Sequence, residues 1–417
     1  KEADKEAFFS RTLATMGELT ADTPLFNQQL QSARFGLGGK GWLPDDDYDV
    51  DYHMRHSSLP RPGTMDELMA LVGRLHSQLL DRTRPLWELH LIDGIENNRF
   101  AIYFKIHHSL IDGVGGMRLM QNMLSESADA DTVRPLGEEE AEQSKRKPSS
   151  RTAVKTLANT VGLATSVAPE MSKTLLGYAR QRILPDDDGA RQWYQAPASP
   201  INVPVSPARR FAVNSFKLQD FKRLSKAKDV TINDIVITIC GGALRRYILE
   251  HWTLPKNSLI AGVPVSVRAK GKDAGNAFSM MMCDMGTHIE DPAERLQFVY
   301  DGTQKSKAHL GSLSRESITG LTVIMGVPLM GSQMLGFARQ TPLPYNVVVS
   351  NVPGSRQKLY LNGAEMISFY ALNLLYDMQS LGITVTSYVD SLDFGLVACR
   401  KTIPELNTLA DYLSLEF

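Results

Sequence analysis

The stretch Lys105–Gly113 constrains the fold most strongly, because it lies where a strand pattern meets a helix pattern. Residues 99–106 are rich in β-branched and aromatic side chains, and residues 117–123 repeat methionine and leucine at helical spacing. Two histidines, an aspartate and a run of glycines separate the two patterns. The sequence therefore predicts a strand, a tight turn and a helix, and turns of this kind often carry catalytic side chains.

The two histidines of this stretch are not equivalent. Successive side chains of a strand point to opposite faces, so His107 and His108 cannot both face one site. We predict that His108 is a general base and that His107 and Asp112 hold the turn. The alternative is that both histidines are structural and that Asp112 only caps the next helix. The complete pattern His-His-x-x-x-Asp-Gly favours catalysis.

Length and charge limit the class of protein. The chain has 417 residues, of which 43% are hydrophobic and 22% are charged, and this is enough for two domains with their own cores. Nucleic-acid-binding proteins usually carry an excess of basic residues. The formal net charge of this chain is −1, so no nucleic-acid partner is expected.

The cysteines indicate a reducing compartment. Cys240, Cys283 and Cys399 lie in apolar stretches, which predicts buried thiols and a cytoplasmic location, with no disulfide framework. The sequence contains no CxxC pair, so we expect neither a zinc site nor any other metal, and no bound cofactor.

One uncharged run, between Glu316 and Arg339, is long enough by count to cross a bilayer. Several glycines and Pro328 interrupt it, so we expect two short apolar helices that meet near Pro328. They line an apolar tunnel, touch a membrane surface or form a buried core hairpin. The sequence starts at Lys1 with neither an initiator methionine nor an apolar signal stretch, and we expect it to be incomplete at the N-terminus.

The order of strand and helix patterns predicts the fold class. Glu96–Asn98 forms a hairpin turn that pairs the strand of Trp87 with the strand that leads to His107. Strands and helices do not alternate regularly along the chain, which argues against a doubly wound parallel sheet. We predict an α/β fold with mixed sheets in two layers, used twice.

Charged and proline-rich segments predict the domain boundaries. A segment with charges of both signs begins at Glu138, and prolines recur between Pro197 and Pro207. We expect an N-terminal domain at 1–137, a linker with crossing helices at 138–208 and a C-terminal domain at 209–417.

Further motifs carry a family resemblance, and they extend from about Trp42 to the C-terminus. They are His107–Gly113, Pro85–Glu88, Asn233–Asp234, Pro264–Arg268, Gly275–Ser279 and Ser350–Gly354. In sequence and order they resemble the bacterial wax ester synthase/acyl-CoA:diacylglycerol acyltransferases. The histidine motif alone is shared with the wider superfamily of chloramphenicol acetyltransferase, carnitine acyltransferases and condensation domains.

The resemblance implies two chloramphenicol-acetyltransferase-like domains with the active site in a tunnel between them. It implies an O-acyltransferase that moves a long-chain acyl group from acyl-CoA to a fatty alcohol or to diacylglycerol. In the family the second histidine of the motif is the general base and the aspartate is structural, and these positions are His108 and Asp112 here. A peripheral contact with the inner membrane face or a lipid droplet would suit such substrates.

Two departures limit the resemblance. Members of the family usually begin with a segment like Pro-Met-His-Val-Gly, which this sequence lacks. The superfamily motif Asp-Phe-Gly-Trp-Gly is present only as Asp393-Phe394-Gly395-Leu396-Val397, so inferences about CoA contacts from the superfamily are weakened.

The chemistry assigns further candidates. A tetrahedral oxyanion needs hydrogen-bond donors, for which we consider Asn233, Asn276 and Ser279, although Asn233 is equally a candidate helix cap. No cysteine has a histidine beside it in sequence, so no covalent acyl-enzyme is expected.

Other motif residues have structural alternatives. Packing against the strand edge is a simpler role for Pro85 and Trp87 than contact with substrate. Arg268 either braces Asp112 or binds the CoA phosphates, and we prefer the brace. Asn351 opens a rigid turn that includes Gly354. Gly363 and Ala364 are candidates for sensing acyl or alcohol length.

Two other functions remain open at this stage. The same fold can use an amine or another alcohol as acceptor, although no carrier domain adjoins the motifs. The chain could instead be a non-catalytic lipid or membrane-surface binder, a function that the apolar run around Pro328 favours.

Overall fold

The computed structural model describes most of the chain, in two compact units. The described residues are 2–21, 23–31, 41–111, 113–129, 196–266, 278–312, 329, 331–333, 336 and 338–417. The first unit consists of Lys1–Ser166 and Gly354–Ile367, and the second of Val167–Pro353 and Ser368–Phe417.

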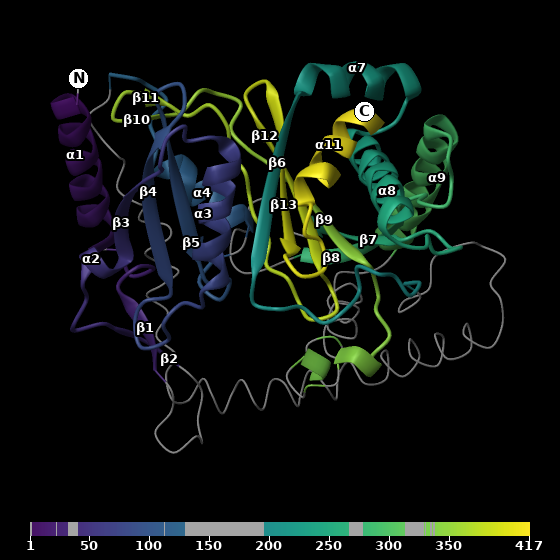
Figure 1. Ribbon diagram of the computed structural model, residues 1–417, viewed down its shortest axis with the longest axis horizontal. Coiled ribbons are helices and arrows are strands. Elements are labelled where there is room, and N and C mark those ends of the chain that lie inside the picture. The colour runs from purple at the N-terminus through teal and green to yellow at the C-terminus, as the bar shows by residue number, and fades with distance from the viewer. Residues whose placement is uncertain are drawn as a thin grey trace. The chain divides into compact units, whose positions relative to one another are not determined.

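The first unit is built on a three-stranded mixed sheet (Figure 1). Strand β4 pairs in parallel with β3 and antiparallel with β5. A separate antiparallel pair, β1 and β2, precedes the sheet in sequence. The elements are α1 (Glu2–Ala21), β1 (Gln28–Gln31), β2 (Gly41–Pro44), α2 (Val50–His53), β3 (Met54–Ser58), α3 (Met65–Ser77), β4 (Trp87–Ile95), β5 (Arg99–Ile106), α4 (Gly113–Asn122), β10 (Tyr360–Leu361) and β11 (Ala364–Glu365).

Local sequence signals explain the ends of several of these elements. Thr64 and Glu67 form a capping box at the start of α3, with the Thr64 N–H donating to Glu67 Oε2 over 2.7 Å. Asn97 and Asn98 take positive φ angles of 61° and 56° in the three-residue connection between β4 and β5, a region that asparagine tolerates better than most residues. The predicted pairing of the Trp87 strand with the strand before His107 is confirmed, since Trp87 lies opposite Ile106.

The spacing of apolar residues predicts that one face of α3 carries Leu68, Leu71, Val72, Leu75 and Leu79. The prediction is correct at Leu68 and Val72, which are buried, but wrong at Leu79. The helix ends at Ser77, and the Leu79 side chain is 95% exposed. Hydrophobic spacing therefore continued past the point where the backbone leaves the helix.

A short segment from the second half of the chain belongs to the first unit. Within Gly354–Ile367 the strands β10 and β11 form a hairpin, and Tyr360 exchanges two backbone hydrogen bonds of 2.7 and 2.9 Å with Ser125. Asn362 also donates its side-chain amide to Thr12 Oγ1 of α1 over 3.0 Å. The chain thus leaves the second unit after Pro353 and returns to it at Ser368.

The second unit is a six-stranded mixed sheet with helices on one face. The strand order is β6-β13-β12-β9-β7-β8, with β12, β9 and β7 parallel and the other neighbours antiparallel. The elements are β6 (Arg209–Lys217), α7 (Leu218–Lys228), α8 (Ile232–His251), β7 (Ile260–Ser266), β8 (Phe278–Asp284), α9 (Pro292–Ser312), η2 (Ala338–Gln340), β9 (Val347–Pro353), β12 (Leu381–Tyr388), β13 (Ser391–Cys399) and α11 (Leu406–Glu416).

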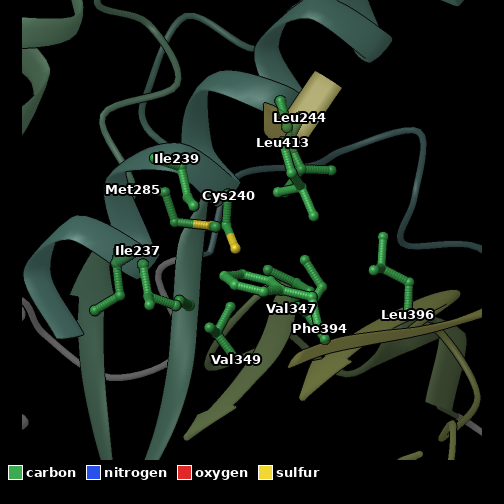
Figure 2. Packing of buried hydrophobic residues seen from close by; sticks show 14 of the residues in the cluster. Ile237, Ile239, Cys240, Leu244, Met285, Val347, Val349, Phe394, Leu396 and Leu413 are labelled. Atoms are coloured by element: carbon green, nitrogen blue, oxygen red, sulfur yellow. The ribbon is translucent and has the colours of Figure 1, made fainter. Parts of the chain in front are cut away.

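The core of this unit lies between the sheet and α8. Alternate residues of β12 and β13, such as Ile383 and Phe394, meet a helix that is buried nearly all round, as its sequence predicted. Figure 2 shows Cys240 and Leu244 of α8 above Val347 and Phe394. Burial of this apolar surface is the main stabilising term for such a unit.

The fold class is confirmed as α/β with mixed sheets. In the first unit, however, side chains pack on both sheet faces, since Phe8 and Phe9 of α1 contact Phe100 while His76 of α3 bonds Tyr103 on the other side.

Most of the run around Pro328 lies outside the described residues. Among the helices that are described, none combines the length and apolar character needed to span a bilayer.

Candidate active site

The histidine motif forms a tight turn at the end of β5. The backbone N–H of His107 donates to the Leu86 carbonyl over 2.9 Å, which extends the β4–β5 pairing by one residue. The N–H of Leu110 then donates back to the His107 carbonyl over 2.9 Å, so His108 and Ser109 occupy the tip of a turn. Helix α4 begins soon afterwards, at Gly113. The predicted sequence of strand, turn and helix is confirmed.

The strand alternation used to separate the two histidines does not reach His108. Strand β5 ends at Ile106, and the turn begins at the next residues. What distinguishes the two rings is therefore hydrogen bonding in the turn. Asp112, which we predicted to hold the turn together with His107, lies outside the described residues.

The ring of His107 is engaged within the turn. Its Nδ1 accepts the Ser109 N–H over 3.1 Å and lies 2.7 Å from Ser109 Oγ. Because Nδ1 uses its lone pair as an acceptor, the neutral ring carries its proton on Nε2. In this arrangement the Nδ1 lone pair of His107 is engaged by Ser109, which fits its predicted role of holding the turn.

The ring of His108 is exposed, and within the described part of the chain the structure gives it no hydrogen-bond partner. A neutral imidazole in this state keeps one ring nitrogen open as an acceptor. The role of His108 as general base stays a prediction.

Charge and burial keep His107 neutral. Partial burial lowers the pKa of His107 below its ordinary value, and the positive charges of Arg82 and of His108, when protonated, lower it further. A neutral His107 preserves the acceptor role of Nδ1 on which the turn depends.

Pro85 and Trp87 lie at the start of β4, the central strand of the first sheet. Both are buried, and Trp87 is the largest fully buried side chain. Its indole N–H donates to the Phe26 carbonyl over 2.8 Å, and its own carbonyl lies 2.9 Å from Nδ1 of His53, whose ring stacks on the indole. These contacts fix Leu86, whose carbonyl accepts the His107 N–H.

In the second unit, Asn233 is not the helix cap that we considered. Thr231 is the N-cap of α8, and it shares a capping box with Asp234. Asn233 lies in the first turn, half-buried, so the cap alternative is wrong for this residue. Its amide is not used for capping.

Ser279 is a buried residue of β8, opposite Val265 of β7. The other two candidates of this region, Asn276 and Arg268, lie outside the described residues. The oxyanion candidates and the proposed brace from Arg268 to Asp112 therefore stay predictions.

The predicted turn at Asn351 is wrong. Asn351 and Pro353 belong to β9, and Asn351 lies opposite Val385 of β12. Pro353 is tolerated there because it is the last residue of the strand. The chain leaves the sheet only at Gly354.

Gly363 and Ala364, the candidates for length selectivity, lie at the β10–β11 hairpin of the first unit. Asn362 and Gly363 have φ angles of 47° and 85°, which explains the Asn-Gly pair. A side chain on Gly363 would meet the Ala128 carbonyl at 3.4 Å. A role in selectivity stays a prediction.

The three thiols are buried, as predicted. Burial raises the pKa of Cys240 and raises that of Cys283 to about 12. For Cys399 burial acts in the same direction, but hydrogen bonds with Ser206 and Thr402 outweigh it and lower the pKa to about 7. Because Cys399 is fully buried, this thiol has no access to a substrate. Within the described residues, no three His, Cys, Asp or Glu side chains form a metal-binding group.

Two residues near the turn, Ser109 and Lys105, were not among the predicted site residues. Ser109 was part of the motif, but its bond to His107 depends on side-chain geometry that spacing does not reveal. Lys105 lies opposite Glu88 in the β4–β5 ladder. Because the pairing of these two strands was predicted, this pair of opposite charges could have been predicted as well.

Comparison with known proteins gives two family matches. The wax ester synthase/diacylglycerol acyltransferase catalytic domain matches residues 1–236, and the C-terminal domain of the same family matches residues 274–417. The O-acyltransferase WSD of Acinetobacter baylyi is 38% identical over 381 residues, which are 91% of this chain and 83% of that protein. A probable diacylglycerol O-acyltransferase of Mycobacterium tuberculosis is 39% identical over 398 residues, with 94% and 85% covered.

Solved structures agree with this match. The wax ester synthase/diacylglycerol acyltransferase of Marinobacter aquaeolei superposes with a TM-score of 0.74 at 32% identity, over 97% of this chain and 88% of that one. A starter condensation domain of rhizomide synthetase gives 0.51 at 13% identity, over 97% and 85%. The second likeness shows a shared fold alone.

Proposed function

The chain belongs to the wax ester synthase/diacylglycerol acyltransferase family and is an O-acyltransferase, and we propose that His108 is its general base. The proposed donor is a long-chain acyl-CoA. The proposed acceptor is the hydroxyl group of a fatty alcohol, which gives a wax ester, or of diacylglycerol, which gives triacylglycerol.

The proposed reaction needs a base because an alcohol is a poor nucleophile at neutral pH. As the alcohol oxygen attacks the thioester carbonyl, Nε2 or Nδ1 of His108 takes the hydroxyl proton, so no free alkoxide forms. The tetrahedral intermediate then collapses, the carbon–sulfur bond breaks, and protonated His108 returns the proton to the CoA thiolate. Imidazole is the side chain that most readily both accepts and releases a proton near neutral pH, so it suits both transfers.

One observation carries this assignment. Both rings are exposed, but His107 Nδ1 is occupied by Ser109. Among the described residues no hydrogen bond engages His108, which supports His108 as the base. His107 and Asp112 are proposed to hold the turn, and Gly113 to let α4 begin directly behind it.

The oxyanion of the intermediate needs donors, each worth on the order of 10²-fold in rate. Asn233, Asn276 and Ser279 are the proposed donors, and Arg268 is proposed to brace Asp112. No covalent acyl-enzyme is proposed, since the one thiol with a lowered pKa, Cys399, is fully buried.

The test follows free thiol released from palmitoyl-CoA by purified protein. We expect release only when hexadecanol or diacylglycerol is added, in a one-to-one ratio with ester. His108→Ala should remain folded and lose both products by on the order of 10²-fold or more. Equal turnover by His108→Ala would remove His108 from the mechanism, and release without an acceptor would indicate hydrolysis.

Acceptor preference is tested with linear alcohols of increasing length against diacylglycerol, at one fixed acyl-CoA. If Gly363 and Ala364 sense chain length, Ala364→Leu should shift the preferred alcohol length. An unchanged preference would exclude Ala364 as a selectivity residue.

We also propose that the protein works in the cytoplasm and contacts a membrane or lipid droplet surface peripherally. The proposed acceptors partition into lipid, and the fully exposed Leu79 offers an apolar contact. In a flotation experiment with phosphatidylcholine vesicles that contain diacylglycerol, the protein should rise with the vesicles. Protein that stays in the dense fraction would contradict this contact.

A further inference from the structure

A buried ionic cluster lies on the face of the first sheet that meets α3. It consists of Arg55 of β3, Glu88 and His90 of β4, and Lys105 of β5. Oxygen Oε2 of Glu88 is 3.5 Å from Arg55, 3.3 Å from His90 and 3.7 Å from Lys105. The side chains of Glu88 and Lys105 are only 8% and 10% exposed. Neither charge can therefore be accounted for as a solvated surface group.

Lys105 uses its ammonium group to join three elements. Nζ donates to the Leu75 carbonyl over 3.1 Å and to the Gln78 carbonyl over 2.7 Å, in addition to its ion pair with Glu88. These two carbonyls lie at the C-terminal end of α3, where a helix leaves acceptors unsatisfied and carries partial negative charge. Three acceptors around Nζ match the three protons of a charged ammonium.

The two groups of the pair respond differently to burial. Burial alone would raise the pKa of Glu88, but His90, Lys105 and Arg55 outweigh it and lower the pKa. Burial lowers the pKa of Lys105, against the attraction of Glu88. The carbonyls of α3 supply further stabilisation of the charged lysine, and we take both groups as ionised at neutral pH.

The position of the pair in the ladder connects it to the histidine turn. Glu88 lies opposite Lys105, Trp87 lies opposite Ile106, and the Leu86 carbonyl accepts the His107 N–H. The ion pair is thus two rungs from the rung that anchors the turn. On the other side of Gln78 the chain leads to Arg82, which is near enough to His107 to affect its titration.

An ionic cluster is a costly way to join two strands. Buried ion pairs are often no more stabilising than apolar residues of the same volume, because both charges lose their hydration. Stability alone therefore does not explain the pair. Hydrogen bonds and ion pairs, in contrast, have preferred directions. This network therefore defines the orientation of α3 relative to β5 more strictly than apolar packing would.

We propose that Lys105, through Glu88 and the carbonyls at the end of α3, is a positioning residue for the His107–His108 turn. The inference rests on the proposed role of His108. Lys105 does not touch the reacting atoms in this account. It fixes the end of β5, so that the His108 ring meets the alcohol at one distance and angle.

The test removes both charges of the pair at once. Lys105→Met alone leaves the buried Glu88 carboxylate with only Arg55 and His90 as partners. The double variant Lys105→Met/Glu88→Gln therefore carries the test, and it leaves Arg55, whose side chain is 38% exposed, to the solvent. We expect it to fold, with kcat about tenfold to a hundredfold lower, since a misplacement of about 1 Å costs this much. The KM for palmitoyl-CoA should stay within about twofold, because only the transition state uses the exact ring position.

Lys105→Arg is the conservative variant. It keeps a buried cation and donors for the α3 carbonyls, so its kcat should lie closer to wild type than that of the double variant. If the kcat of Lys105→Arg is as low as that of the double variant, the geometry of the ammonium group is required and not its charge alone. That result supports positioning if KM is unchanged, and contradicts it if KM rises.

The matched control is a buried ion pair in the second unit. Arg295 and Glu416 are 2.9 Å apart, with side chains 1% and 4% exposed. Arg295→Met/Glu416→Gln should change the unfolding transition but leave the kcat of the folded protein within about twofold. An equal loss of kcat in both double variants, or wild-type kcat in Lys105→Met/Glu88→Gln, would overturn the inference. If His108→Ala retains activity, the proposed function itself fails, whatever the Lys105 variants show.

Discussion

Two turns that lead into helices show opposite treatments of polar side chains. At the start of α8, Asp234 is fully buried, and its carboxylate accepts the Thr231 N–H over 2.9 Å and the Thr303 hydroxyl over 2.6 Å. At the turn before α4, Ser109 engages His107, while His108 is exposed.

The difference separates a structural site from a chemical one. A buried group whose atoms all have partners stabilises the fold and has nothing left to offer a ligand. An exposed imidazole with an open nitrogen costs little stability and can accept a proton. The sequence motifs at the two turns are equally polar, so only the partners distinguish them.

The largest effect expected at the two turns is a loss of stability on substitution of Asp234. Asp234→Ala removes the N-cap partner of Thr231 and the acceptor of the Thr303 hydroxyl. The free energy of unfolding should fall by about 2–4 kcal/mol, the sum expected for a lost cap and a lost hydrogen bond to a charged group. Urea unfolding followed by circular dichroism measures it.

The same variant should keep the kcat of its folded fraction within about threefold of wild type. Loss of kcat with unchanged stability would break the comparison, because Asp234 would then act on the chemistry.

A smaller effect is expected at the histidine turn. Ser109→Ala removes the hydroxyl that lies 2.7 Å from His107 Nδ1 but keeps the backbone N–H at 3.1 Å. The turn should loosen, and kcat should fall about threefold to tenfold. Ser127→Ala is the control, since Ser127 also bonds a neighbouring N–H in the first unit, that of Asp129, and it should change kcat by less than about twofold. Equal effects would leave Ser109 without a special role.

The smallest effect concerns pH. Burial lowers the pKa of His53 below its ordinary 6.5, so the unfolded chain binds a proton more readily than the folded one. Stability should therefore fall as the pH drops below about 6.5 and level off below the folded pKa. His53→Gln cannot titrate, and its unfolding free energy should depend less on pH in this window. An unchanged slope would assign the pH dependence to other groups.

Much of the fold followed from local sequence. The capping box at Thr64, the Asn97–Asn98 turn and the helix Leu218–Lys228 all appear where their residues predict them. Each depends on contacts between residues near in sequence, and such signals are visible without a structure.

Other features depend on distant contacts. Asn351 lies in a strand because β12 pairs with it, although Pro353 and Gly354 favour a turn. No local sequence signal indicates that Gly354–Ile367 joins the first unit, where Tyr360 pairs with Ser125. For the site, the motif predicted which histidine to test, but the reason lies in the His107–Ser109 contact and not in strand alternation.

The central claim is that the two histidines have different roles, and the most direct test compares His107→Gln with His108→Gln. Their kcat values are measured side by side with saturating palmitoyl-CoA and hexadecanol. The account predicts that kcat of His108→Gln lies on the order of 10²-fold below that of His107→Gln. An equal kcat in the two variants, or a lower one in His107→Gln, would contradict it.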